Sequence, residues 1–149
     1  MALRTPMFFK YFAQTYRLDS TPGGGRQGTI LNLTTGLFEQ DNGPIDEITR
    51  ATSTSDIKTL TEERFVQETE AARMSFLRGD GPIFALYDTI RGIDALAVKE
   101  GRSRSAQETA LVKALRTRTF KMWAEEADRR AAGAPPSFPV TSVAQEPGR

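Results

Sequence analysis

Apolar residues recur every three or four positions through the second half of the chain, which is the spacing of an amphipathic helix. The clearest stripe predicts a helix over about 82–100, with apolar positions Ile83, Leu86, Tyr87, Ile90, Ile93, Leu96 and Ala97. Weaker stripes predict helices over about 60–77 and about 106–132. We therefore expect a mainly α protein, with a three-helix core around Ile83, Leu86, Ile90, Ile93, Leu111, Leu115 and Met122.

Capping and stop signals support these boundaries. Thr59 with Glu62, and Ser105 with Glu108, have the spacing of a capping box, in which side chains satisfy free backbone N–H groups at a helix start. Pro82 ends a glycine-rich turn and suits the first turn of a helix, because its missing N–H is not needed there. Two helices joined by so short a turn are expected to fold back on each other.

The first half of the chain is less regular. Residues 29–39 are rich in β-branched and apolar residues and favour a small hairpin, whereas residues 19–28 contain three successive glycines and favour a loop. The opening aromatic segment is ambiguous, because Phe8, Phe12 and Tyr16 share a face at helical spacing but alternate poorly as a strand. The expected N-terminal region is irregular or a small β-hairpin.

We expect three segments along the chain: an aromatic and basic arm with the glycine-rich loop at 1–28, a helical domain with a small hairpin at 29–132, and an extended tail at 133–149. The tail holds four of the 8 prolines and few large apolar residues. Alone it cannot bury enough surface to offset the entropy of ordering, so we expect it to bind a neighbouring protein.

The composition narrows the chemistry. The 149 residues include no His and no Cys, which excludes the usual nitrogen and sulfur zinc sites, histidine-activated nucleophiles and disulfides. No run of 18 apolar residues is present, so no transmembrane segment is expected, and the opening residues lack the apolar core of a secretory signal. We expect a non-enzymatic protein without a cofactor, located in the cytoplasm or within a viral or other macromolecular particle.

The near-neutral net charge of +1 hides a segregated distribution. Residues 39–70 carry nine acids and three bases, whereas residues 101–121 carry six bases and one acid. The basic strip predicts a contact for nucleic acid or an acidic protein partner, made by Arg102, Arg104, Lys113, Arg116, Phe120 and Lys121. The alternative is that this strip faces the protein's own acidic segment.

Two further patterns favour structure over chemistry. Gly23–Gly28 spells the G-x-G-x-x-G of dinucleotide-binding loops, but a strand rather than a helix is expected after it, which favours a flexible loop. Asp56, Glu63 and Glu70 could meet around a hard cation, as in an enzyme that uses carboxylates, but no calcium-loop spacing is present. We expect a solvated acidic face and no metal site there.

The aromatic arm and the tail are the expected docking segments. Their candidate partner-binding residues are Phe8, Phe9, Phe12, Tyr16, Phe138 and Val140. The simpler alternative for the rings of the arm is that they complete the protein's own core, and another is an anchor on a membrane surface. We interpret the sequence as a structural or adaptor subunit of a larger assembly, bound to other protein subunits, with a nucleic-acid-binding module on the basic third helix as the alternative function.

Overall fold

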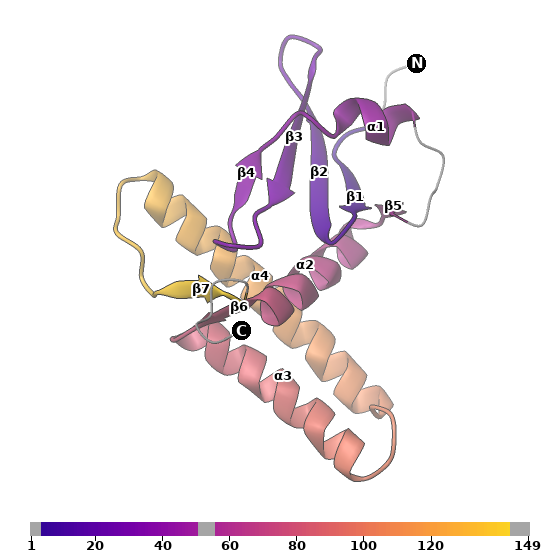
Figure 1. The fold of residues 1–149 in the computed structure, drawn as a ribbon, viewed down its shortest axis with the longest axis vertical. Helices are drawn as coiled ribbons and strands as arrows, with labels where there is room; N and C mark the ends of the chain where they lie inside the picture. Colours follow the sequence, from indigo (N-terminus) through magenta and orange to yellow (C-terminus); the bar gives the residue numbers. More distant parts are fainter. Residues whose placement is uncertain (1–3, 51–55, 144–149) are drawn as a thin grey trace.

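The computed structural model describes residues 4–50 and 56–143, and its N-terminal part is a five-stranded antiparallel sheet (Figure 1). The strands are β1 (Met7–Tyr11), β2 (Gln14–Ser20), β3 (Arg26–Leu31), β4 (Phe38–Gln40) and β5 (Ile57–Leu60). Their order in the sheet is β4-β3-β2-β1-β5. A short helix, α1 (Ile45–Arg50), lies between β4 and β5 in the chain.

The second half contains three helices close to the expected ranges. They are α2 (Glu62–Phe76), α3 (Pro82–Lys99) and α4 (Ala106–Ala131). The capping box of Ser105 and Glu108 forms at the start of α4. At α2 the N-cap is Thr61 rather than Thr59, and its hydroxyl accepts a hydrogen bond from the backbone N–H of Arg64. Thr59 lies in β5 instead, so the expected capping box at that position is wrong.

The expectation of a mainly α protein is also wrong, because 49% of the described residues are helical and 23% lie in strands, which makes this an α/β fold. The reason is that both faces of the sheet are covered. Neighbouring side chains of a strand point to opposite faces, yet Phe8 and Phe9 are both buried. Phe9 packs in the same cluster as Ile45 of α1, whereas Phe8 contacts Phe65 of α2. A strand buried on both faces shows no alternation of apolar and polar residues, so its pattern resembles a helix.

The tail returns to the body of the protein. β7 (Val140–Ser142) pairs antiparallel with β6 (Leu77–Gly79), the short strand between α2 and α3. The backbones approach so closely that a Cβ on Gly79 would lie 2.6 Å from the carbonyl oxygen of Pro139. The tail therefore packs on the protein's own elements as far as the structure describes it, and positions 144–149 of the expected tail lie outside the described residues.

The core has two parts. One lies between the sheet and α1 and consists of Phe9, Tyr16, Leu18, Ile30, Ile45, Ile48 and Ile57. The other joins β6, α3 and α4 and consists of Leu77, Ile83, Phe84, Tyr87 and Trp123. Of the seven residues expected in a three-helix core, Ile83 and Ile90 are buried, four are partly buried and Leu111 is 48% exposed.

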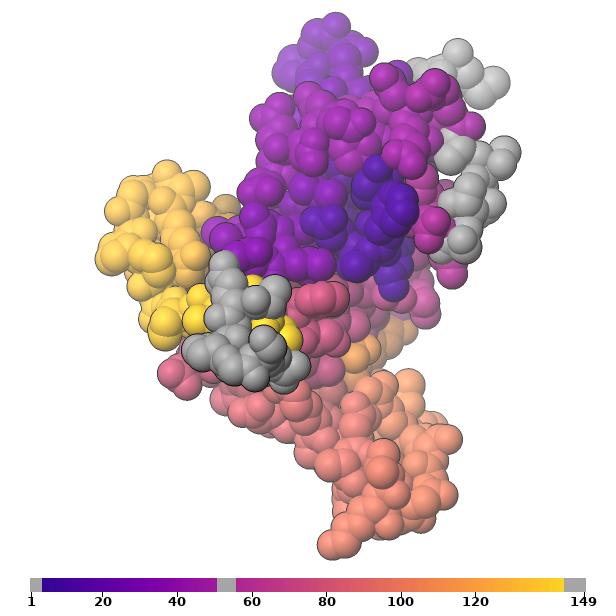
Figure 2. All heavy atoms as spheres, viewed as in Figure 1, coloured from indigo at the N-terminus to yellow at the C-terminus, as the bar shows by residue number. Residues whose placement is uncertain are grey.

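The helices α3 and α4 form a hairpin whose far end projects away from the sheet (Figures 1 and 2). Figure 2 shows this end as a narrow extension below the body of the molecule. The projection explains the exposure of Leu111, because on this part of α4 no further layer covers the side chain. Within the described ranges no helix is both long enough and apolar enough to cross a membrane.

Candidate functional site

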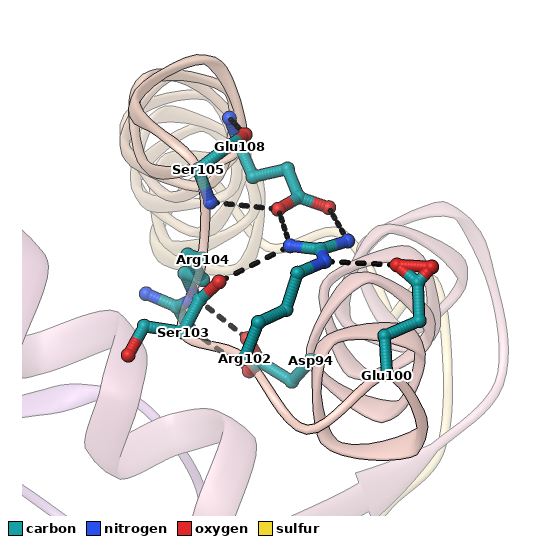
Figure 3. Close-up of polar contacts among 7 residues, drawn as sticks. All are labelled: Asp94, Glu100, Arg102, Ser103, Arg104, Ser105 and Glu108. Carbon is teal, nitrogen blue, oxygen red and sulfur yellow. Dashed lines mark hydrogen bonds and ion pairs between the residues drawn. The ribbon is translucent and has the colours of Figure 1, made fainter.

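Ion pairs fix the turn between α3 and α4 (Figure 3). Arg102 donates to Glu100 (2.8 Å) and to Glu108 (2.6 Å). Arg104 donates to both carboxylate oxygens of Asp94, at 2.6 and 2.8 Å. The bonds from Arg102 are the main reason that the pKa of Glu108 falls to about 2, and those from Arg104 lower the pKa of Asp94. Two of the basic residues expected to contact a partner thus already have carboxylate partners of their own.

The structure brings three of the expected basic residues to an open pocket between α2 and α4. Its volume is about 220 Å³. The lining residues are Glu63, Arg64, Gln67, Arg104, Thr109, Val112, Lys113 and Arg116. Sequence reasoning missed Arg64, because this residue belongs to the acidic segment and only the packing of α2 on α4 brings it to the basic strip.

Among the described residues, one of the four cations of this pocket forms no direct ion pair. Three are paired, as Arg64–Glu68, Lys113–Glu63 and Arg104–Asp94. The Nε atom of Arg116 is buried and has no hydrogen-bond partner among residues 4–50 and 56–143. Burial lowers the pKa of Arg116, and repulsion from Arg104 adds to that effect. Attraction from Asp94 and from the α2 carboxylates offsets only part of it.

Phe120 and Lys121 do not line this pocket. The ring of Phe120 lies edge-on to Phe65, with 6.1 Å between ring centroids, and 5.8 Å from the guanidinium carbon of Arg73. It is therefore engaged inside the protein and is not free to stack on a nucleic-acid base. Lys121 lies on the exposed surface of α4.

The aromatic arm is largely built into the sheet. Phe8, Phe9 and Tyr16 are at most 7% exposed, and the hydroxyl of Tyr16 donates to the carbonyl oxygen of Asp41 (2.6 Å). Phe12 differs, because it occupies the tight turn between β1 and β2 with a φ of 57° and is 50% exposed. Of the four rings expected to bind a partner, three lie in the core and Phe12 is accessible.

The two candidate residues of the tail pack on the protein itself. The ring of Phe138 lies edge-on to Phe84 and to Trp123, with centroid distances of 5.8 and 5.4 Å. Val140 pairs with Gly79 between β7 and β6. Both residues are partly buried in this arrangement.

A buried polar network lies at the meeting point of the helices. Glu70 accepts hydrogen bonds from Arg73 Nη1 and from the hydroxyl of Tyr87, both at 2.7 Å, and Trp123 Nε1 donates to that hydroxyl at 2.9 Å. Arg73 also donates to the carbonyl oxygen of Gly36 (2.8 Å). Since the four side chains are at most 3% exposed and each has a partner, the network has a structural role. No sequence pattern predicts this network, because its members come from three helices and a loop.

The acidic segment and the glycine-rich run do not form ligand sites of the kind their patterns suggest. In the part of the chain that the structure describes, no three acidic residues lie close enough to hold a metal ion. Glu70 is paired with Arg73, and Glu63 with Lys113. The run Gly23–Gly28 leads from β2 into β3 and is not followed by a helix.

Exposed apolar side chains gather on the projecting hairpin. Of the five large hydrophobic residues that are exposed in the described ranges, Leu96 (48%), Val98 (78%) and Leu111 (48%) lie there. Apart from Arg91 and Asp94, whose side chains are 41% and 39% exposed, the exposed positions of α3 between Thr89 and Val98 carry no charge. The charged residues of that stretch, Arg91 and Asp94, are partly buried and bonded to Met74 and Arg104. Sequence periodicity placed Leu96 and Leu111 in the core, because it identifies an apolar face but not what covers it.

The fold and these surfaces define an α/β protein with a projecting helical hairpin and a basic pocket at its side. No family model matches the chain, and neither a curated protein nor a solved structure matches it. A fold alone does not imply a function, so the function has to be argued from the hairpin and the pocket.

Proposed function

We propose that the protein is a non-enzymatic subunit of a larger assembly and that it docks on another protein through the projecting α3–α4 hairpin. The observation that carries this proposal is the exposed surface of α3 between Thr89 and Val98, where the two charged residues, Arg91 and Asp94, are held in ion pairs and the other exposed positions are uncharged, in a chain with 26% charged residues. The cores of protein interfaces are depleted of charge in the same way. Leu96, Val98 and Leu111 supply the apolar anchors.

The chemistry of the surface favours a helical protein as the partner. Apolar side chains on two neighbouring helices form ridges and grooves, and another helix fills such grooves well. Nucleic acid would gain little from this surface, since Lys113 is the one charged residue among the exposed positions of 106–114. Other protein subunits are therefore the partners we propose.

This proposal moves the docking surface away from the aromatic arm and the tail. Phe8, Phe9 and Tyr16 would have to leave the core to reach a partner, and Phe138 would have to leave Trp123. Such exposure of buried rings would cost several kcal/mol, about 1.5–3 kcal/mol for each side chain. The hairpin surface needs no such rearrangement.

The experiment compares two changes in the full chain. Leu96→Glu with Val98→Glu places charge on the hairpin, and Phe12→Glu places charge on the arm, in each case at exposed positions. Partners are recovered with the unchanged protein from its own source after nuclease treatment. The major recovered protein is then purified and titrated against the unchanged chain and both variants.

We expect the hairpin variant to bind at least about tenfold more weakly and the Phe12 variant to bind about as tightly as the unchanged chain. Circular dichroism and the melting temperature serve as controls that both variants are folded. The reverse pattern of affinities would place docking on the arm and reject the hairpin. A chain that is recovered without any stoichiometric protein partner would contradict the assembly itself.

The alternative function, a nucleic-acid-binding module on the basic third helix, has less support. That helix is α4, and its Phe120 is packed against Phe65. Arg102 and Arg104 are held by carboxylates. Of the remaining basic residues expected to contact nucleic acid, Lys113 is paired with Glu63, Arg116 lies in the pocket and Lys121 is exposed away from it.

A further inference from the structure

The pocket between α2 and α4 combines a hollow, a cluster of cations and one arginine whose buried Nε atom has no hydrogen-bond partner in the described part of the chain. We propose that this pocket binds a phosphate group and that Arg116 is the residue that holds it. Arg116, the residue that holds the phosphate, is not one of the apolar anchors of the hairpin, Leu96, Val98 and Leu111. The phosphate-binding proposal can therefore be tested independently of the proposed docking function.

The position of Arg116 is the first argument. A guanidinium has five N–H donors in a planar fork. The Nε donor of Arg116 is buried and has no hydrogen-bond partner within the described chain. Leaving a buried donor without an acceptor lowers the stability of a folded protein. A bound anion supplies the missing acceptors, and the two parallel N–H groups of an arginine fit two oxygens of a phosphate.

The surroundings of Arg116 supply further donors. The hydroxyl of Thr109 and the ammonium of Lys113 line the same pocket, and Glu63 is the one carboxylate among the lining residues. Gln67 Nε2 donates to the backbone carbonyl oxygen of Lys113 (3.1 Å), which ties α2 to α4 at the wall of the pocket. A pocket whose walls are already fixed loses less entropy when a ligand binds.

The paired cations remain available to a ligand. In the Lys113–Glu63 pair the side chains are 55% and 60% exposed, and Arg64 is 66% exposed in its pair with Glu68. Exposed ion pairs contribute little to stability, so these side chains can exchange a carboxylate for a phosphate oxygen at low cost. Arg104 is held more firmly by Asp94 and contributes its charge from a fixed position.

The size of the pocket selects a single anionic group. Its volume of about 220 Å³ is below the range of about 300–1,000 Å³ that is usual for drug-sized ligands. Phosphate offers at least three acceptor oxygens to the donors present, whereas a carboxylate offers two. The chemistry is shared by a free phosphate, a phosphate monoester and the phosphates of a nucleic-acid strand.

The experiment compares Arg116→Gln with Arg118→Gln in the full chain. The two substitutions remove the same charge from the same helix, but Arg118 is exposed and does not line the pocket. The probes are inorganic phosphate, a nucleoside 5′-monophosphate, a ten-nucleotide single strand of deoxythymidine, and acetate as a carboxylate control. Binding is measured by the rise in melting temperature with probe concentration and by NMR shifts of the arginine Nε–H groups.

We expect phosphate to stabilise the unchanged protein and to shift the Arg116 Nε–H resonance. Its affinity should fall about tenfold or more in Arg116→Gln and by less than about twofold in Arg118→Gln. Without any anion, Arg116→Gln should melt no lower than the unchanged protein, because the substitution removes a guanidinium whose buried Nε atom has no hydrogen-bond partner in the described part of the chain. Arg116→Lys, which keeps the charge but not the fork, should bind phosphate with intermediate affinity.

The three phosphate probes distinguish the sources of the ligand. Tightest binding of the monophosphate assigns the pocket to a small phosphorylated molecule, and tightest binding of the oligonucleotide with the same dependence on Arg116 assigns it to strand phosphates. The proposal is overturned if phosphate does not bind at tens of millimolar, or if acetate binds as well as phosphate. Equal weakening by the Arg116 and Arg118 substitutions also overturns it, because binding would then follow net charge alone.

Discussion

Glu70 and Arg73 form an ion pair that water barely reaches, with side-chain exposures of 0% and 3%. Moving two charges out of water costs several kcal/mol for each ion, and the pair offsets this cost only if their other donors and acceptors are bonded too. Here the hydroxyl of Tyr87 and the carbonyl oxygen of Gly36 provide those bonds. Each charge therefore depends on the presence of the other.

Arg73→Met should lower the free energy of unfolding by about 3–5 kcal/mol, because Glu70 would remain buried without its counterion. Urea unfolding followed by circular dichroism measures this loss. The matched control is Asp88→Asn, which breaks an exposed pair with Arg91 and should cost less than about 1 kcal/mol. Similar losses in the free energy of unfolding for both variants would show that the buried Glu70–Arg73 pair contributes no more to stability than an exposed pair.

Two glycines should respond to alanine in opposite ways. A Cβ on Gly28 of β3 would lie 1.5 Å from the hydroxyl oxygen of the buried Tyr16, whereas a Cβ on Gly92 of α3 would meet nothing within 4 Å. Gly28→Ala should destabilise the protein by about 1–3 kcal/mol through overpacking. Gly92→Ala should stabilise it by about 0.5–1 kcal/mol through a better helix propensity. Thermal unfolding of both variants measures these effects. Changes in melting temperature of the same sign in the two variants would contradict this prediction.

The contact between α4 and the tail depends on one carboxylate. Glu126 is 5% exposed and accepts hydrogen bonds from the backbone N–H and the hydroxyl of Ser137, and from Arg129 and Arg130. Burial opposes the charged form of Glu126, but the bonds from Ser137, followed by those from Arg130 and Arg129, outweigh it and lower the pKa to about 2. The charged carboxylate thus stabilises the attachment of the tail.

Because the folded pKa of Glu126 is depressed, its stabilising contribution is present above the ordinary value of 4.5 and is lost as the pH falls toward about 2. We expect the fluorescence of Trp123, which lies against Phe138, to change over this interval. At neutral pH, Glu126→Gln should speed hydrogen exchange in β7, and the exposed neighbour Glu125→Gln should not. Equal rates of hydrogen exchange in β7 of both variants would show that Glu126 does not stabilise the attachment of the tail.

The helices and the strands differ in how far sequence could predict them. Each long helix has a covered face and an exposed face, so its apolar spacing is visible in the sequence. β1 is buried on both faces, and its pairing with β5 joins segments that are far apart in the chain, so local pattern could not reveal it. The pocket was partly foreseeable, since Lys113 and Arg116 share the basic strip. Arg64 was not foreseeable, because it reaches the pocket only through the packing of α2 on α4.

Across the whole molecule, the buried network connects the sheet to the hairpin. Arg73 bonds to Gly36, in the loop between β3 and β4, and Glu70 links through Tyr87 of α3 to Trp123 of α4. Each of these elements contributes a partner to the buried network. If one element unfolds, a buried polar group in another element loses its hydrogen-bond partner. The sheet and the helices should therefore lose their structure together.

We expect a single cooperative transition in urea, with Trp123 fluorescence and the circular dichroism of the whole chain giving coincident curves. Trp123 reports on the centre of the network, whereas the dichroism averages over sheet and helices. Two separated transitions would mean that the hairpin unfolds independently of the sheet. The same measurement on Arg73→Met should broaden or split the transition.

The pairing of β6 with β7 also constrains how the chain is made. A ribosome releases the N-terminal part first, so β6 emerges well before the residues of β7 that complete its small sheet. During that interval the β6 edge has no partner strand and Trp123 lacks the ring of Phe138, and an open edge beside an uncovered aromatic ring favours pairing with another chain. Slow translation between α4 and the tail should therefore lower the yield of folded protein, even though no residue of the finished structure is changed.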